Sequence, residues 1–259
     1  MLDFGCPLPN NVHLEWASKS DWESLLCADE EIYIQNAALK RQREFRAGRN
    51  TAHRAMYKLC EAQLAHKGLS KNQEQLIYKK QAYFKLPINV GESRQPLWPL
   101  PYVGSITHSQ ATKLHSCAVV TGFQQDIASI GIDIEPLEAL PEDAQSLIIT
   151  PNELQRSARL YRPVHWEKYI FAAKESFFKC LFPLTGIYLD FLEAEFEMIP
   201  IDASGLAYKV NLAHICPENY QHLPVWIGNI HIYVAAVGHF VHAVSWLDQT
   251  DNPLKNLLK

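Results

Sequence analysis

The chain has 259 residues, of which 47% are hydrophobic and 20% charged, and its formal net charge is −4 at pH 7. That length suits one large domain or two small ones. The negative net charge excludes a protein whose overall charge attracts it to nucleic acid or to anionic membranes. The six cysteines form no C-x-x-C pair, so neither a zinc knuckle nor a redox motif is predicted, and we expect reduced thiols in a cytoplasmic protein.

The first half begins with a helical pattern. Residues 29–66 are rich in Ala, Leu, Glu, Gln, Lys and Arg and contain no proline, and Gly68 follows, which predicts one helix or two. Residues 81–101 contain four prolines and predict a loop with short extended pieces. Strands are then expected over 102–106, 115–121 and 127–135.

The second half also starts with helices. Thr150 and Glu153 have the spacing of a capping box, with Pro151 in the first turn, and Pro163 is expected to end this helix. Residues 164–181 predict a second, strongly apolar helix that Pro183 and Gly186 end. Strands are then expected over 191–198, 207–212, 225–232 and 240–246.

The order of helix followed by strands thus occurs twice. It predicts an α+β protein of two similar halves, residues 1–123 and 124–259. The most apolar stretch, residues 230–247, is interpreted as two buried strands around Gly238 rather than as a transmembrane span. Residues 1–11 lack the basic and apolar regions of a secretory signal, so none is expected.

Two carboxylates stand out in the strand expected over 127–135. Asp133 and Glu135 are two residues apart and so share one face of it. Their flanks, Ile130, Ile132 and Ile134, favour burial, which is costly for two carboxylates unless a positive charge compensates. A metal ion satisfies this requirement, although an exposed edge strand carrying two solvated carboxylates is the simpler alternative.

Glu175 and Lys179 form a second pair, four residues apart on one helix face. Such a pair is ordinary on an exposed helix, but this helix is apolar nearly all round, which favours burial and a functional role. If the two faces meet, three carboxylates and an ammonium can hold Mg²⁺ against a phosphate. Lys174 either contacts a phosphate or only reaches solvent.

Phosphate ligands are also expected elsewhere. Residues 104–109 place hydroxyls and His108 at the end of a short strand, where they can bind phosphate oxygens, although a structural histidine is equally compatible. Arg41 and Arg49 lie roughly 80° apart around a helix and can reach one anion, although a solvated face explains most arginines of this run. Gly48 inside a helix indicates a close approach.

These motifs resemble those of the 4′-phosphopantetheinyl transferases. Residues 131–136 and 171–179 resemble the paired signature of that family, and Trp98-Pro99 with residues 104–109 matches its third motif. Residues 41–49, 183–186 and 189–191 resemble the siderophore branch, the enterobactin-synthase type. The chain departs from the usual pattern in having Phe171 where many members have tryptophan, and Thr107 where serine is usual.

The resemblance implies two similar α+β halves with the active site at their interface. It implies Mg²⁺-dependent transfer of 4′-phosphopantetheine from coenzyme A to a serine of an apo aryl or peptidyl carrier protein in siderophore biosynthesis, by a monomer. Asp133, Glu135 and Glu175 would hold the metal, Glu175 would accept the serine proton, and Lys179 would stabilise the pyrophosphate. The residues expected to bind coenzyme A are Arg41, Arg49, Arg94, Thr107, His108 and Lys174.

Two alternatives use the same residues. A Mg²⁺-dependent pyrophosphohydrolase of coenzyme A or a related nucleotide would need the same carboxylates but no carrier protein. A non-catalytic docking subunit of a peptide synthetase would keep the fold but need none of the charges, yet Asp133, Glu135, Glu175 and Lys179 are all present.

Overall fold

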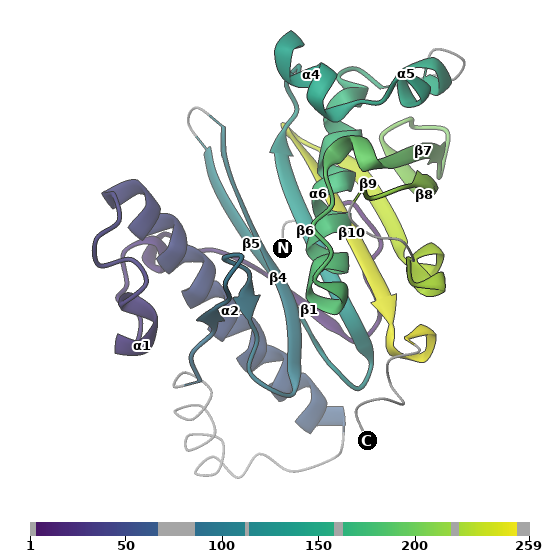
Figure 1. The fold of residues 1–259 in the computed structure, drawn as a ribbon. Helices are drawn as coiled ribbons and strands as arrows, with labels where there is room; N and C mark the ends of the chain where they lie inside the picture. Colours follow the sequence, from purple (N-terminus) through teal and green to yellow (C-terminus); the bar gives the residue numbers. More distant parts are fainter. Residues whose placement is uncertain (1–3, 67–85, 112–113, 158–162, 219–222, 253–259) are drawn as a thin grey trace.

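Runs of helices and runs of antiparallel strands follow one another along the chain and assemble into a mixed α and β fold, which confirms the predicted fold class (Figure 1). The computed structural model describes residues 4–66, 86–111, 114–157, 163–218 and 223–252. Over these residues the larger strands form two sheets, and a short hairpin pairs β2 (Asn89–Val90) with β3 (Pro96–Leu97).

The first sheet has the order β1–β5–β4, made of Val12–Trp16, Leu114–Phe123 and Tyr102–Ala111. The long helix α2 (Leu39–His66), preceded by the short helix α1 (Ala28–Glu31), packs on it (Figure 1). The contact is close at Gly48, where an added Cβ would lie 2.9 Å from Cγ2 of Ile106. The two-helix alternative and the close approach at Gly48 are both confirmed, whereas Gly68 lies outside the described residues.

The second sheet has the order β6–β10–β9–β8–β7. Helix α6 (Trp166–Thr185) covers one of its faces, and α4 (Glu142–Ile148) and α5 (Pro151–Ser157) lie beyond one end of α6 (Figure 1). The capping box of α5 forms as predicted, because the backbone amides of Thr150 and Glu153 each bind the other residue's side chain. The strands span Ile127–Pro136, Phe240–Asp248, His231–Val237, Ala207–Ile215 and Ala194–Pro200.

The two sheets meet where strand β4 runs beside β6. Ser105 Oγ accepts a hydrogen bond of 3.0 Å from the amide of Ile132, and Thr107 Oγ1 accepts one of 3.2 Å from the amide of Ile134. Side-chain hydroxyls of β4 therefore satisfy backbone donors at the edge of β6, where an open strand edge would leave them unpaired. This junction brings the hydroxyl-rich motif of β4 directly against the carboxylate motif of β6.

Strand β6 has two different faces. Ile130, Ile132 and Ile134 are buried in a core with Phe4 and Trp246. The opposite face, which carries Asp133 and Glu135, turns toward α6, because successive residues of a strand alternate in direction. The predicted shared face of the two carboxylates is therefore confirmed.

Several predicted boundaries were wrong. Strand β4 continues to Ala111 instead of ending at residue 106, because its hydroxyl residues face β6 and form the junction rather than a turn. Helix α6 continues through Pro183 to Thr185 instead of ending at residue 181, whereas the predicted stop at Gly186 is confirmed: its positive φ of 66° closes the helix, with a bond from its amide to Phe182 O. A proline in the last turn removes little of the helical hydrogen bonding.

Two predicted strands begin later than expected. Residues 191–193 form a 3-10 turn before β7, started by a capping box between Asp190 and Glu193. Residues 225–229 form another 3-10 turn after Pro224, and β9 starts only at His231. Trp226 and Ile227 are apolar because they are buried in this turn, not because they belong to a strand. Short 3-10 turns also span Lys19–Trp22 and Gln249–Asp251.

The apolar stretch 230–247 does form two strands, β9 and β10, as interpreted from the sequence. None of the helices described is both long and apolar enough to cross a membrane. Residues 158–162, which precede Pro163, are outside the described part of the chain, so the expected helix end there is not tested.

Candidate active site

Asp133 lies at the point where β4, β6 and α6 meet. Its side chain is buried, and its Oδ1 accepts hydrogen bonds from Lys179 Nζ at 2.6 Å and from Thr107 Oγ1 at 3.2 Å. Its other oxygen, Oδ2, is buried without a hydrogen-bond partner among the described residues. An unpartnered carboxylate oxygen is costly to bury, so this atom marks a position where a cation would be stabilised.

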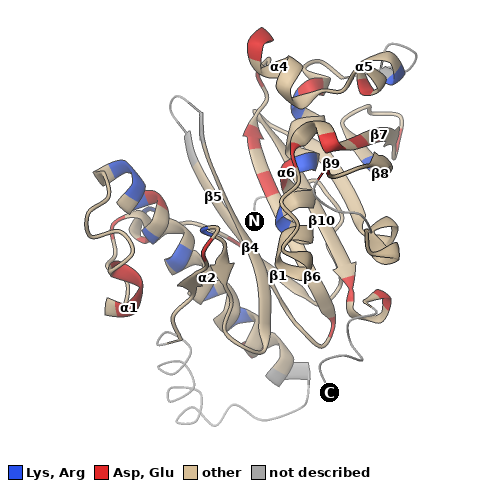
Figure 2. Cartoon of the chain, viewed as in Figure 1, with Lys and Arg blue, Asp and Glu red and all other residues tan. Residues whose placement is uncertain are grey.

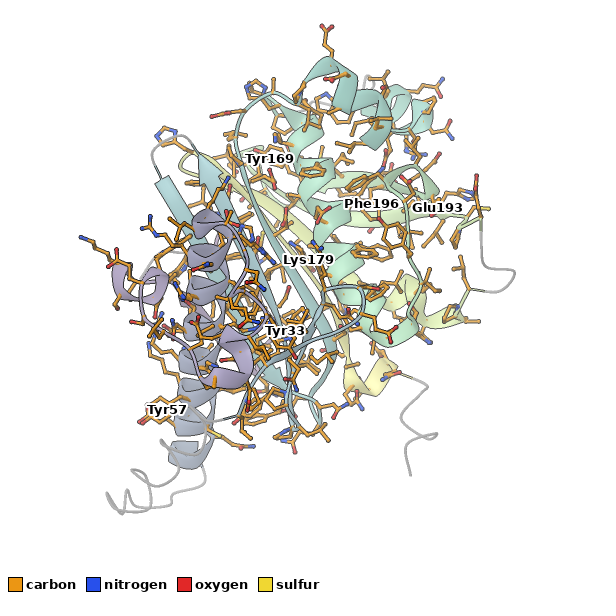
Figure 3. The ribbon with its side chains drawn as sticks, turned by 60° about the vertical axis from the view of Figure 1, so that its left-hand side comes forward. Tyr33, Tyr57, Tyr169, Lys179, Glu193 and Phe196 are labelled. Carbon is orange, nitrogen blue, oxygen red and sulfur yellow. The ribbon has the colours of Figure 1, made fainter. Side chains whose placement is uncertain are left out.

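Lys179 projects from α6 toward the strands (Figure 3). Besides Asp133, its ammonium contacts the carbonyl of Ile132 at 3.3 Å and the carboxylate of Glu175 at 4.0 Å, one helical turn earlier. Burial opposes the charge of this ammonium, but Asp133 and then Glu175 outweigh it, so the pKa of Lys179 is raised. Lys179 therefore remains protonated and is available to neutralise negative charge.

The other two predicted metal ligands line the same junction. Glu135 Oε2 is 3.5 Å from Lys168 Nζ, and burial, followed by repulsion from Asp133, raises the pKa of Glu135 to about 7. Burial also raises the pKa of Glu175, although Lys179 opposes the shift. Two of the three carboxylates thus hold their negative charge at a cost that a metal ion would remove. In Figure 2 acidic segments of β6 face basic and acidic segments of α6.

This donor set fits a magnesium ion. Oxygen ligands from a few carboxylates, completed by water and substrate phosphates, are what Mg²⁺ prefers. The unpartnered Oδ2 of Asp133 is the local feature that a cation would satisfy. Two further carboxylate oxygens are paired with lysines: Oδ1 of Asp133 with Lys179, and Oε2 of Glu135 with Lys168.

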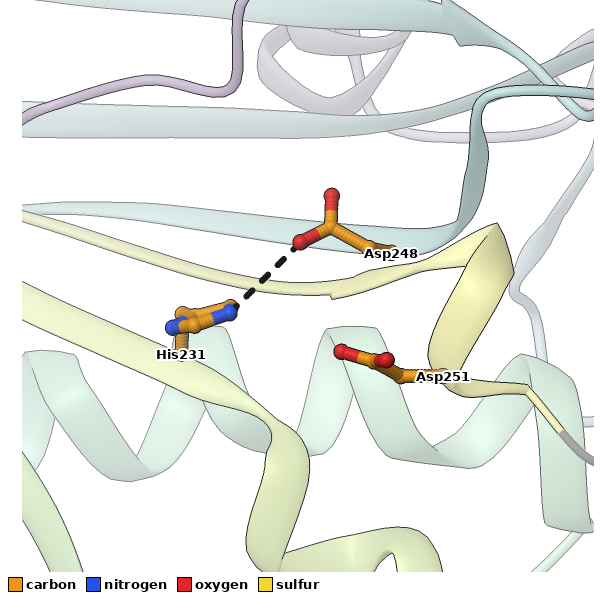
Figure 4. A group of neighbouring side chains, drawn as sticks. All are labelled: His231, Asp248 and Asp251. Atoms are coloured by element: carbon orange, nitrogen blue, oxygen red, sulfur yellow. Dashed lines mark ion pairs between the residues drawn. The ribbon is translucent and has the colours of Figure 1, made fainter.

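A second group of potential ligands lies at the far end of β10. His231, Asp248 and Asp251 are the group of described residues whose ligand atoms all lie within 4.8 Å of one another (Figure 4). His231 pairs with Asp248 at 3.5 Å and stacks on Trp246, and the pair is partly exposed. The ion pair between His231 and Asp248 accounts for this arrangement. The group is separated from Asp133 by several residues along β6 and β10.

The position of Thr107 differs from the expectation. Its hydroxyl donates to Asp133 and accepts from the amide of Ile134, and the residue is buried. Because its single O–H donor is used on Asp133, this hydroxyl orients Asp133 and has no donor to spare for the coenzyme A phosphate contact expected from the sequence. Only its neighbour His108 remains a candidate for that contact.

If Asp133 holds a metal ion, substituting Thr107 should weaken metal binding. Thr107→Val keeps the shape but removes the bonds to Asp133 and Ile134, and we expect activity to fall about 10-fold, with a higher Mg²⁺ requirement. Thr107→Ser keeps the hydroxyl and should stay within about 2-fold of wild type. Mg²⁺ titrations of initial rates test this, and equal Mg²⁺ dependence of both variants would contradict it.

His108 lies on the opposite face of β4, toward α2, because strand side chains alternate. The ring is exposed, yet partial desolvation lowers the pKa of His108, and Arg41 lowers it further while Glu44 opposes. Arg41 is exposed and lies near Glu44 at 3.8 Å. Arg41 is thus near enough to His108 to influence its charge, and the predicted contact of both residues with coenzyme A stays a prediction.

Arg49 is more deeply placed than expected. Its side chain is 6% exposed, it lies 4.7 Å above the ring of Phe45, and its Nε has no hydrogen-bond partner among the described residues. Burial lowers the pKa of Arg49 to about 10, despite Glu30 nearby. Its Nε lies 4.0 Å from Glu30 Oε1, and the charge of Arg41 lowers the pKa of Arg49 further, so the two arginines act on the same region of α2.

Lys174 does not fit the expected contact with coenzyme A. Its ammonium donates three hydrogen bonds of 2.7–2.8 Å, to Ile148 O, Phe191 O and Glu153 Oε2. Three donors are all that an ammonium has. Lys174 therefore ties α6 to the end of α4, the start of α5 and the turn before β7, and this role replaces the predicted ligand contact.

Two cavities open beside Glu175 and Lys179. One, of about 680 Å³, is lined by Arg94, Trp98, Ser105 and Lys179, among others, and so includes the predicted ligand Arg94. The other, of about 210 Å³, is lined by Glu175 and by Phe177, Phe178 and Tyr188. The site thus has a small pocket with aromatic walls beside Glu175 and a larger, mostly apolar cavity beside Lys179.

Lys168 was missed by the sequence interpretation. It precedes Glu175 by seven residues, which is two helical turns and the same helix face. That spacing was the signal that could have identified it.

The family models match both halves of the chain. The model described as the 4′-phosphopantetheinyl transferase N-terminal domain matches residues 29–121, and the one described as the 4′-phosphopantetheinyl transferase superfamily matches residues 129–235. The second match contains all three predicted metal ligands, and the first contains Arg41, Arg49, Arg94, Thr107 and His108. The chain belongs to the 4′-phosphopantetheinyl transferase family.

Individual relatives agree. The chain is 36% identical over 180 residues to 4′-phosphopantetheinyl transferase Svp of Streptomyces mobaraensis, covering 68% of this chain and 63% of that protein. It is 30% identical over 176 residues to 4′-phosphopantetheinyl transferase Npt of Nocardia iowensis, covering 68% of each. It is 37% identical over 129 residues to enterobactin synthase component D of Escherichia coli K12, covering 46% and 58%. The chain therefore spans just under two thirds of Svp and less of the last relative.

Proposed function

We propose that this protein transfers 4′-phosphopantetheine from coenzyme A to a serine of an apo carrier protein in a Mg²⁺-dependent reaction. The observation that carries this proposal is the buried Asp133, held by Lys179 and Thr107 with one oxygen unpartnered, beside Glu135 and Glu175. Family membership supplies the reaction class. The arrangement of these side chains supports the choice of residues that would perform it.

Asp133, Glu135 and Glu175 are the proposed metal ligands. A bound Mg²⁺ would neutralise the pyrophosphate of coenzyme A and orient it. Lys179 stabilises the charge that develops on the α-phosphate as its bond to the β-phosphorus breaks. It is held for this task by Asp133 and by the carbonyl of Ile132.

Glu175 is the proposed general base. Its pKa is raised by burial, which brings it closer to that of an effective proton acceptor at neutral pH. It takes the serine proton directly or through water, the serine oxygen attacks the β-phosphorus, and adenosine 3′,5′-bisphosphate leaves. The aromatic cavity next to Glu175 suits the uncharged pantetheine arm.

The nucleotide end of coenzyme A would lie on the other side of Lys179. Arg41 and Arg49 on α2 and Arg94 on the larger cavity would supply positive charge for its phosphates, and His108, whose pKa is lowered by desolvation, would add a hydrogen bond as a neutral ring. His108 is the proposed contact of the 3′-phosphate.

That contact leads to a specific expectation. His108→Ala should raise the KM for coenzyme A about 10-fold, because one charge-assisted hydrogen bond to the 3′-phosphate is worth about 1.5–3 kcal/mol. The KM for dephospho-coenzyme A should hardly change. Initial rates with both substrates, in wild type and variant, test the contact, and equal weakening of the two would refute it.

The setting of the reaction is part of the same proposal. The carrier is an aryl or peptidyl carrier protein of siderophore biosynthesis, as the similarity to enterobactin synthase component D suggests. The enzyme acts as a cytoplasmic monomer, with all six cysteines as free thiols. Residues 1–123 and 124–259 act as two halves with the active site between them.

The direct test is the intact mass of an apo aryl carrier protein after incubation with this protein, coenzyme A and Mg²⁺. A gain of one phosphopantetheine unit that disappears with EDTA is expected. Consumption of coenzyme A without a mass gain would favour the pyrophosphohydrolase. Intact coenzyme A with several carriers would favour the docking subunit.

A further inference from the structure

Lys168 is a charged group of the site that the proposed mechanism does not use. It lies on α6 two turns before Glu175, and its Nζ is 3.5 Å from Glu135 Oε2. The ammonium also lies 5.6 Å from the centre of the Phe171 ring. The Lys168 side chain is 12% exposed, so its charge is screened by solvent much less than that of a surface lysine.

The three carboxylates thus have lysines at both ends. Lys179 holds Asp133 and approaches Glu175, whereas Lys168 holds Glu135. The two lysines play different parts, because Lys179 binds at the centre of the junction and Lys168 only at its edge. Lys168 is also the one positive side chain that is in contact with Glu135 in the described structure.

We propose that Lys168 is a resident counter-ion of Glu135 that competes with the divalent cation. This inference rests on the metal site of the proposed function. The ammonium pairs with Oε2 of Glu135, so a metal can use that oxygen only after the pair breaks, and the positive charge also repels the incoming ion at either oxygen. Lys168 therefore weakens metal binding by the free enzyme. It acts through Glu135 and does not touch the substrate.

The test measures metal binding without turnover. Mn²⁺ is the probe, and electron paramagnetic resonance reports free Mn²⁺ in titrations of the full chain without coenzyme A. Lys168→Met removes the charge but keeps most of the packing on Phe171, and we expect Mn²⁺ to bind about 10-fold more tightly. Lys168→Arg keeps the charge and should bind Mn²⁺ within about 3-fold of wild type.

A matched control removes a lysine from another lysine–glutamate pair. Lys58 pairs with Glu15, between α2 and β1, away from the carboxylates of β6. Lys58→Met should leave Mn²⁺ affinity unchanged, and circular dichroism should show that all variants are folded.

The outcomes separate the two ideas. If Asp133→Asn abolishes Mn²⁺ binding but Lys168→Met leaves it unchanged or weakens it, the role of Lys168 alone is overturned. If Asp133→Asn leaves Mn²⁺ binding unchanged, the metal site is overturned and this inference with it. The same follows if neither the wild type nor Lys168→Met binds Mn²⁺. Tighter binding in Lys168→Met, with Lys168→Arg near wild type, supports the counter-ion role.

Discussion

Replacing Asp133 by asparagine is expected to reduce phosphopantetheine transfer by about 10²–10³-fold while the protein stays folded. The amide has the size of the carboxylate, and its oxygen can still accept the bonds from Thr107 and Lys179. It lacks the negative charge that would hold Mg²⁺ and balance Lys179. The loss should appear in kcat at saturating coenzyme A, because the missing interaction stabilises the transition state.

The measurement is the rate of carrier modification by mass spectrometry at several Mg²⁺ concentrations, together with thermal unfolding. Partial recovery at high Mg²⁺ would be consistent with a weakened metal site. Turnover near the wild-type rate at low Mg²⁺ would remove Asp133 from the metal ligands. Loss of the folded state would instead make Asp133 mainly a structural residue.

The carboxylate motif was predictable because it depends on short-range periodicity. Residues two apart in a strand, or four apart in a helix, share one face whatever the rest of the fold is. Asp133 and Lys179 thus come together as expected, and their 2.6 Å contact joins the two motifs. The fold class followed from the same kind of local pattern.

The environment of each side chain was harder to predict. Thr107 and Lys174 have the chemistry of phosphate ligands, but neighbours from distant parts of the chain use all their donors. The sequence cannot show that Thr107 meets β6, because that depends on how the two sheets join. The 3-10 turn at 225–229 was likewise hidden, since buried residues such as Trp226 are apolar in any secondary structure.

One glycine makes the meeting of the two motifs possible. An added Cβ at Gly131 would lie 2.0 Å from the carbonyl oxygen of Ser176 and 2.7 Å from the amide of Cys180. Both atoms belong to the backbone of α6, in the turn that carries Lys179. Glycine is thus required here for the close approach of helix and strand, which sets the distance between Asp133 and Lys179.

Gly131→Ala should therefore damage stability and activity together. Backbone atoms of α6 cannot move aside as a flexible side chain would, so the helix must shift, and we expect a loss of about 3 kcal/mol in the free energy of unfolding. That corresponds to a melting temperature about 6–12 °C lower for a chain of this size. The shift should also separate Lys179 from Asp133 and lower kcat at temperatures where the variant is still folded.

Gly228→Ala is the matched control, because an added Cβ there would meet no atom within 4 Å. It should change the melting temperature by no more than about 2 °C, since substitutions without a new contact usually stay within about 0.5 kcal/mol. Thermal unfolding and carrier modification, measured on both variants, decide the question. If Gly131→Ala matched Gly228→Ala in both measurements, the packing of α6 on β6 would have to be looser than described, and the distance between Asp133 and Lys179 would depend on other contacts.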